Sequence, residues 1–111
     1  MAYNPLCDFL ETHPFTRRIR DLISDDEYRI IQLALGFRPD QGVIIPGTRG
    51  IRKLRWSKEG RGKRGGIRII YYWHKSTNRI YMLLAYPKSK QDDLTAAQNR
   101  ILSRLVKEEF R

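Results

Sequence analysis

The sequence is poor in the residues that build disulfides and metal centres. It has one cysteine, Cys7, so no disulfide can form within the chain. Its two histidines, His13 and His74, are far apart in the sequence, which excludes the ligand spacing of a zinc site. The acidic residues occur as pairs at the expected ends of helices, Asp92 and Asp93 for example beside the positive end of the last helix. No set of carboxylates for magnesium is indicated, and we expect no metal or other cofactor.

Long apolar segments are also missing. No run approaches the roughly eighteen consecutive apolar residues of a membrane-spanning helix. Residues 1–15 lack the basic start, apolar stretch and cleavage site of a signal peptide. With its single cysteine, the chain is expected in the reducing cytoplasm and away from membranes. A chain of 111 residues with 41% apolar residues can bury one core, which predicts a single domain over residues 1–111.

The positive charge of the chain is concentrated in one segment. Residues 49–75 hold ten Lys or Arg residues and one acid, Glu59, which gives this segment a charge of +9. The whole chain carries +10 from 22 basic and 12 acidic residues, so the remainder, with 12 bases and 11 acids, is close to neutral. Each base that neutralises a phosphate releases counterions, so such a segment is typical of a site for a polyanion. The aromatic run at 71–73 favours unpaired RNA, whose bases stack on aromatic rings.

Hydrophobic periodicity predicts three helices and a sheet. Helices are expected from Pro14, after Ser24 and after Thr95, and residues 24–27 and 95–98 match capping boxes. Short or alternating apolar runs predict strands at residues 7–11, 43–45, 51–57, 67–74 and 79–86. This order predicts an α+β domain: a mainly antiparallel, twisted sheet of four to five strands with two N-terminal helices and one C-terminal helix. We expect all helices to pack on one face of the sheet.

Strand alternation places cations and tyrosines on shared faces. Arg68 and Tyr72 share a face of the strand at 67–74, and Lys53 and Arg55 share a face of the preceding strand. The neighbours Tyr71 and Trp73 are expected in the core. An ordinary solvated strand face is the alternative reading of Lys53 and Arg55.

The last strand is expected to add a further part of the same surface. Strict alternation puts Ile80, Met82, Leu84 and Tyr86 on one face of this strand, which Lys88 extends. If the faces coincide, the sheet presents one cationic concavity lined by aromatic rings, and a slip of one residue would turn these side chains into the core. The expected members of the concavity are Lys53, Arg55, Arg68, Tyr72, Tyr86 and Lys88.

Residues 60–66 are basic and rich in glycine, and are expected to form a loop. The loop lacks the Gly-Lys-Ser/Thr ending of a nucleotide-binding phosphate loop, and it precedes a strand rather than a helix. Its basic residues are therefore expected to bind RNA phosphates rather than to take part in chemistry. The expected RNA-binding residues are Arg52, Lys58, Arg61, Lys63, Arg64, Tyr72 and Lys90.

Three blocks of the sequence carry a family resemblance. They are residues 47–56, residues 60–72, and the motif Tyr86-Pro87-Lys88 followed by residues 93–95. In this order they resemble the RelE/ParE superfamily of bacterial toxins, and its HigB-like branch in particular, over residues 15–110. Two positions depart from the pattern: Arg49 stands where relatives often have glycine, and Pro87 where a small residue is usual.

The resemblance implies the toxin of a type II toxin–antitoxin system, a metal-independent endoribonuclease that cleaves messenger RNA in the ribosomal decoding site. In the implied reaction the ribose 2′-OH attacks the adjacent phosphate. Arg68 would bind that phosphate, because a guanidinium matches two phosphate oxygens. Lys53 and Arg55 would add charge, Lys53 among neighbouring cations could serve as a base, and Lys88 is the alternative acid or base. Tyr86 or Tyr72 would stack on a base or orient the 2′-OH.

Two other functions stay open at this point. The same superfamily contains toxins that bind DNA gyrase and cleave nothing, and a catalytically decayed relative could retain RNA binding alone. The implied partners are the ribosome with its messenger RNA and a cognate antitoxin that is HigA-like, with a helix-turn-helix domain. Operator DNA would be contacted only through that antitoxin, and no membrane partner is expected.

Overall fold

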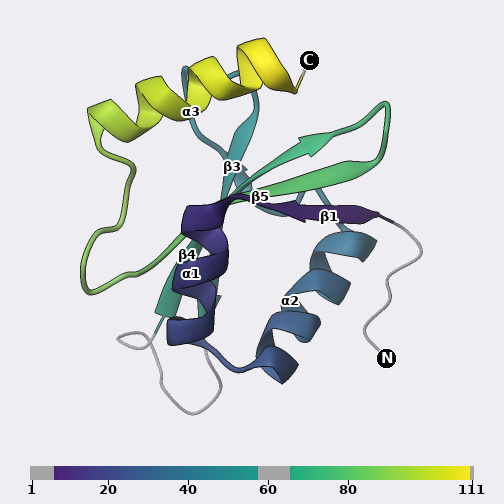
Figure 1. Ribbon diagram of the computed structural model, residues 1–111, viewed down its shortest axis with the longest axis vertical. Coiled ribbons are helices and arrows are strands. Elements are labelled where there is room, and N and C mark those ends of the chain that lie inside the picture. The colour runs from purple at the N-terminus through teal and green to yellow at the C-terminus, as the bar shows by residue number, and fades with distance from the viewer. Residues whose placement is uncertain (1–6, 58–65, 111) are drawn as a thin grey trace.

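The protein is a five-stranded sheet with helices on both faces (Figure 1). This computed structural model describes residues 7–57 and 66–110. The elements are β1 (Asp8–Glu11), α1 (His13–Leu22), α2 (Asp25–Phe37), β2 (Val43–Ile44), β3 (Ile51–Ser57), β4 (Gly66–His74), β5 (Arg79–Pro87) and α3 (Ala96–Glu109). The strand order is β1-β5-β4-β3-β2; β1 pairs parallel with β5, and the other pairs are antiparallel. The predicted α+β architecture is therefore confirmed.

Short side chains cap the helices, mostly as the sequence predicts. Ser24 caps α2 by accepting from the Glu27 main-chain N–H at 3.1 Å, and Thr95 and Gln98 form a complete capping box at α3. The expected return contact of Glu27 to Ser24 is wrong. Glu27 Oε2 instead accepts from Trp56 Nε1 at 2.9 Å, which joins α2 to β3. Glu27 thus bonds to Trp56, which is distant in the sequence, instead of to the main chain of Ser24.

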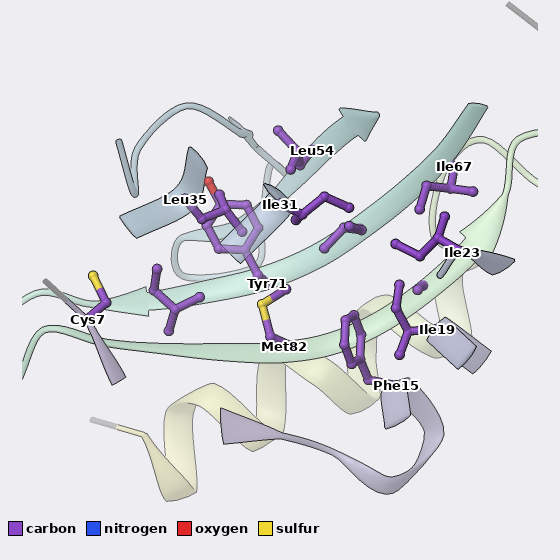
Figure 2. Close-up of a cluster of buried hydrophobic side chains, with 13 residues drawn as sticks. Cys7, Phe15, Ile19, Ile23, Ile31, Leu35, Leu54, Ile67, Tyr71 and Met82 are labelled. Atoms are coloured by element: carbon purple, nitrogen blue, oxygen red, sulfur yellow. The ribbon is translucent and has the colours of Figure 1, made fainter. Parts of the chain in front are cut away.

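The expectation that all helices share one sheet face is also wrong. One buried cluster joins α1 and α2 to the sheet through side chains such as Phe15, Ile31 and Tyr71 (Figure 2). A second buried cluster joins α3 to the other face through Leu102 and Val106. The physical reason is β4, whose residues from Gly66 to Tyr71 are buried on both sides, so both faces need cover. Among the described residues, no helix is long and apolar enough to cross a membrane.

A bulge in β5 decides which side chains face α3. Ile70 pairs with Leu84 and Tyr71 pairs with Met82, so Leu83 is an extra residue on β5. Ile80 and Met82 therefore lie in the cluster with α1 and α2, whereas Tyr86 lies in the cluster with α3. The prediction that all four alternate residues share one face is wrong, because the extra residue reverses the alternation. Without the bulge, Tyr86 would face the same core as Met82.

The turn before β3 holds Arg49 in a left-handed backbone conformation. Its φ is 63°, between Gly47 at 76° and Gly50 at 104°. We expect Arg49→Gly to raise the free energy of unfolding by about 1 kcal/mol, because the left-handed region is disfavoured for residues with a Cβ. Denaturant unfolding measures this change. Gly50→Ala should have the opposite sign, and destabilisation by Arg49→Gly would show that contacts of the arginine outweigh its backbone strain.

Candidate functional site

Three adjacent strands bring a row of predicted site residues together on the α3 side of the sheet. Arg55 of β3 lies opposite Arg68 of β4, and Arg68 lies opposite Tyr86 of β5. Lys53, two residues before Arg55, extends from the same face of β3. The expectation that these faces coincide is confirmed for the four residues. Like charges directly opposite each other destabilise a sheet, so this row points to a site rather than to fold stability.

Arg68 is held by an acid that the sequence analysis assigned to a helix end. Its Nε donates to Asp92 Oδ1 at 2.7 Å, and its side chain is only 8% exposed. The hydrogen bond from Arg68 holds the pKa of the Asp92 carboxyl below its usual value, and the charges of Lys53 and Arg55 act in the same direction. Three cations therefore act on one carboxylate.

Lys53 is paired with the neighbouring acid. Its Nζ lies 2.5 Å from Asp93 Oδ1 and 3.8 Å from Asp92 Oδ1, and its side chain is 11% exposed. The Asp93 side chain is 82% exposed, so this ion pair has one largely covered and one solvated partner. The sequence predicts that Lys53 lies among cations, which is the reason to consider it a base. In the structure it is instead paired with two acids. An anion already occupies the place next to its ammonium group.

Tyr86 completes the group as a buried phenol. Its hydroxyl donates to the main-chain oxygen of Asp92 at 3.0 Å. Burial raises the pKa of Tyr86 to about 12, the nearby charges of Asp93 and Asp92 add to this effect, and Arg68 opposes it. The side chain is therefore a neutral phenol near neutral pH, suited to hydrogen bonding rather than to accepting a proton.

The Tyr86 phenol should make stability depend on alkaline pH. Because its pKa is raised from 10.0 to about 12, the folded state binds this proton more tightly than the unfolded state does. Its contribution to stability is complete below pH 10 and is lost as the pH rises toward 12. We expect the free energy of unfolding of the wild type to fall more steeply in this window than that of Tyr86→Phe. Denaturant unfolding at a series of pH values measures the difference, and parallel curves would contradict it.

A hollow of about 190 Å³ adjoins the cations. Lys53, Arg55 and Asp93 line one part of it, and residues 43–46, which include β2, line the rest. The Val43 and Ile44 side chains are exposed at this edge of the sheet. The site therefore combines an anion-binding group with adjacent apolar surface.

Tyr72 shares the face of this row but lies in a different part of it. It lines a larger hollow of about 570 Å³ together with Arg49, Val106 and Lys107. Between Tyr72 and Arg68 lies Ile70, which is buried in the cluster that contains Leu102 and Val106 of α3. The single concavity predicted from the sequence is thus divided by α3. Tyr72 instead lies beside Tyr81 and Phe110, with ring centroids 6.5 and 6.2 Å away.

Lys88 and Lys90 are exposed residues directly after the row. The Lys88 main-chain N–H donates to the Gly66 oxygen at 3.0 Å, so Pro87 does not interrupt the pairing between β4 and β5. Lys88 is therefore brought to the same end of the sheet as Arg68 and Tyr86. Lys90 lies in the turn that follows, where its N–H donates to the Pro87 oxygen at 3.0 Å.

Arg52, another predicted RNA-binding residue, does not belong to this row. Arg52 alternates to the α2 side of the sheet, where its Nη1 donates to the main-chain oxygens of Asp40 at 2.9 Å and Gly42 at 2.8 Å. It thereby holds the segment between α2 and β2. The other four, Lys58, Arg61, Lys63 and Arg64, lie outside the described residues.

Asp92 and Asp93 were not among the site residues predicted from the sequence. A usable signal was present, because the sequence has no other acid between Glu59 and Glu108. An arginine in an apolar strand needs an acceptor, and these two acids are the only carboxylates between Arg68 and Glu108 in the sequence. Within residues 7–57 and 66–110, no group of three or more His, Cys, Asp or Glu side chains could hold a metal ion.

Comparison with known proteins gives a fold but no family. No protein-family model matches the chain. Among solved structures, it is similar to a double arginine-to-alanine mutant of the E. coli toxin RelE in its free state, with a TM-score of 0.58 and 13% sequence identity. The match covers 78% of this chain and 87% of that one. The likeness shows that this chain has a RelE-like fold.

Proposed function

We propose that this protein is the toxin of a type II toxin–antitoxin system, of the HigB-like branch, and a ribosome-dependent endoribonuclease that cleaves messenger RNA without a metal. The observation that carries the proposal is the row of Arg55, Arg68 and Tyr86 with Lys53 beside it. The RelE-like fold supports the proposal at the level of architecture. We propose the cytoplasm as its location, where ribosomes are found.

The carboxylates in the site indicate what the cations can bind. Asp92 and Asp93 place negatively charged oxygens 2.7 Å from Arg68 Nε and 2.5 Å from Lys53 Nζ. A phosphate group offers oxygens of the same charge and suits the planar guanidinium fork of Arg68. Binding RNA would replace the contact of Asp93, whose side chain is largely solvated. The apolar hollow beside Lys53 would take a flanking nucleobase.

The proposed chemistry divides among the residues of the row. The ribose 2′-oxygen forms a bond to phosphorus while the bond to the 5′-oxygen breaks, which leaves a cyclic phosphate and a free 5′-hydroxyl. Arg68, assisted by the charge of Arg55, stabilises the developing charge on the phosphate oxygens. Tyr86, a neutral phenol, orients the reacting groups by hydrogen bonding. Lys53 and Lys88 are the groups proposed to take the 2′-OH proton and to supply one to the leaving oxygen.

The remaining basic residues would bind RNA around this centre. We assign ribosomal or messenger RNA contacts to Lys58, Arg61, Lys63, Arg64 and Lys90, which follow or precede the strands of the row. Tyr72, with Arg49 and Lys107 beside it, offers an aromatic ring at a separate place on the same face. The proposed protein partner is a HigA-like antitoxin with a helix-turn-helix domain, through which the complex contacts operator DNA.

Inducible expression in bacteria tests this function. The wild type should arrest growth within minutes and produce new transcript 5′ ends inside translated frames, and Arg68→Ala should produce neither. Arrest with intact transcripts and an induced DNA-damage response would replace the proposal with gyrase inhibition. No arrest at all would indicate a decayed relative that keeps only the fold.

A further inference from the structure

Asp92 is the residue on which the proposed catalytic groups converge. Its Oδ1 accepts from Arg68 Nε at 2.7 Å, and its main-chain oxygen accepts from the Tyr86 hydroxyl at 3.0 Å and from Lys53 Nζ at 3.4 Å. These three side chains come from β4, β5 and β3, whereas Asp92 lies in the segment between β5 and α3. One residue thus connects all three strands of the row.

The end of α3 does not account for this placement. Thr95 is the N-cap, and no acidic residue lies in the first turn of the helix. The Asp92 side chain is 48% exposed, so water could solvate its carboxylate without any protein contact. Arg68, at 8% exposure, is the buried partner, and its guanidinium requires an acceptor. The contact therefore satisfies a requirement of Arg68 rather than one of Asp92.

The contact uses one edge of the guanidinium. Asp92 takes Nε, and Nη1 donates to the main-chain oxygen of Ile67 at 3.4 Å. Arginine carries five N–H groups in a rigid planar fork, so fixing Nε fixes the direction of the others. Within the part of the chain that the structure describes, Nη2 makes no hydrogen bond. The terminal nitrogens are thus the ones a phosphate would meet.

We infer that Asp92 is a positioning residue, which holds the Arg68 guanidinium by its Nε edge and the Tyr86 hydroxyl by its main-chain oxygen so that both face the scissile phosphate. The effect of Asp92 on catalysis rests on the proposed endoribonuclease activity. The placement of Arg68 and Tyr86 by Asp92 does not. Asp92 itself does not touch the RNA in this arrangement.

The opposing possibility is that Asp92 blocks the site by competing with phosphate for Arg68. The two roles predict effects of opposite sign. Removing a blocking carboxylate would strengthen RNA binding and speed cleavage, whereas removing a positioning carboxylate would slow cleavage without strengthening binding. Asp93 contacts Lys53 with a largely solvated side chain, and so fits the blocking role better than Asp92 does.

The geometric part is tested in the free protein by heteronuclear NMR of the arginine Nε–Hε groups. We expect a slowly exchanging Arg68 signal in the wild type, assigned by its absence from Arg68→Ala. The signal should be lost in Asp92→Ala and kept in Asp92→Asn, which retains an oxygen acceptor. An unchanged signal in Asp92→Ala would overturn the inference, whether or not the protein cleaves RNA.

The catalytic part is tested by single-turnover cleavage of messenger RNA on purified ribosomes. We expect Asp92→Ala to lower the maximal rate by about 10²-fold, the size expected of a misplaced catalytic group, with the half-saturating concentration unchanged. Asp92→Asn should recover part of the rate. In an Arg68→Ala background, Asp92→Ala should have little further effect, because it acts through that arginine. Asp21→Ala, an exposed carboxylate on α1, is the matched control for the change in charge and should cleave like the wild type.

Each outcome is informative. Faster cleavage or tighter RNA binding by Asp92→Ala would establish the blocking role and overturn the inference. An equal loss in both backgrounds would overturn it too, since Asp92 would then act independently of Arg68. If the wild type does not cleave, the proposed function fails, and the NMR result alone decides whether Asp92 positions Arg68.

Discussion

Replacing Arg68 with alanine is expected to lower the rate of messenger RNA cleavage by about 10²-fold or more, the largest effect of any single substitution in the site. The guanidinium is buried beside the proposed phosphate position, and its loss removes the charge that stabilises the transition state. It also leaves the Asp92 carboxylate without its partner at 2.7 Å, so this acid would repel the incoming phosphate. The measurement is the single-turnover rate on purified ribosomes programmed with a defined message.

Two further variants make this prediction specific. Arg68→Lys keeps the charge but not the planar fork, and should recover only a part of the lost rate. Arg17→Ala removes an exposed positive charge from α1, on the opposite side of the sheet, and should leave the rate near that of the wild type. Equal losses in Arg17→Ala and Arg68→Ala would show that net charge, rather than a phosphate-binding arginine, determines activity.

The second large effect concerns stability and falls on Tyr71. Its side chain is fully buried in the cluster with α1 and α2, and its hydroxyl donates to the Pro39 oxygen at 2.7 Å and accepts from the Gly42 N–H at 2.9 Å. Tyr71→Ala should lower the free energy of unfolding by about 3–5 kcal/mol through the cavity that it leaves. Tyr71→Phe keeps the ring but leaves the buried Gly42 N–H and the part-buried Pro39 oxygen without this partner, and should lower the free energy of unfolding by about 1–3 kcal/mol.

Denaturant unfolding measures both changes, and the structure supplies two comparisons. Gly42→Ala should also destabilise, because an added Cβ would lie 2.7 Å from Tyr71 Cε1 and 3.1 Å from Arg52 Cβ. Tyr72→Phe, one residue along β4 but half-buried on the other face, should change stability by less than about 0.5 kcal/mol. A larger loss in Tyr72→Phe than in Tyr71→Phe would mean that the α3 side, and not the α1 and α2 side, carries the main core.

The loss of folding would also remove the site, which links the two predictions. Tyr71 and Arg68 belong to the same strand, and β4 pairs with both β3 and β5. An unfolded Tyr71→Ala would be inactive for a reason unrelated to chemistry. Activity assays on site variants therefore need the unfolding midpoint of each variant beside the rate.

Local patterns in the sequence were enough to predict most of the elements. The capping box of Thr95 and Gln98, the strand alternation that places Lys53 and Arg55 on one face, and the inward direction of the Tyr71 ring all follow from spacing over a few residues. The concentration of positive charge is a property of composition and needs no fold. These features follow from the short-range periods of helices and strands, which any close reading of the sequence can detect.

The tertiary structure alone decided how the site is assembled. The bulge at Leu83 turns Tyr86 toward Arg68, and α3 covers the face that the sequence analysis left open. The acids that hold the cations come from far along the chain: Asp92 lies 24 residues after Arg68, and Asp93 lies 40 residues after Lys53. Such pairs are selected by burial and by the need of a buried charge for a partner, which are properties of the packed molecule rather than of any local pattern.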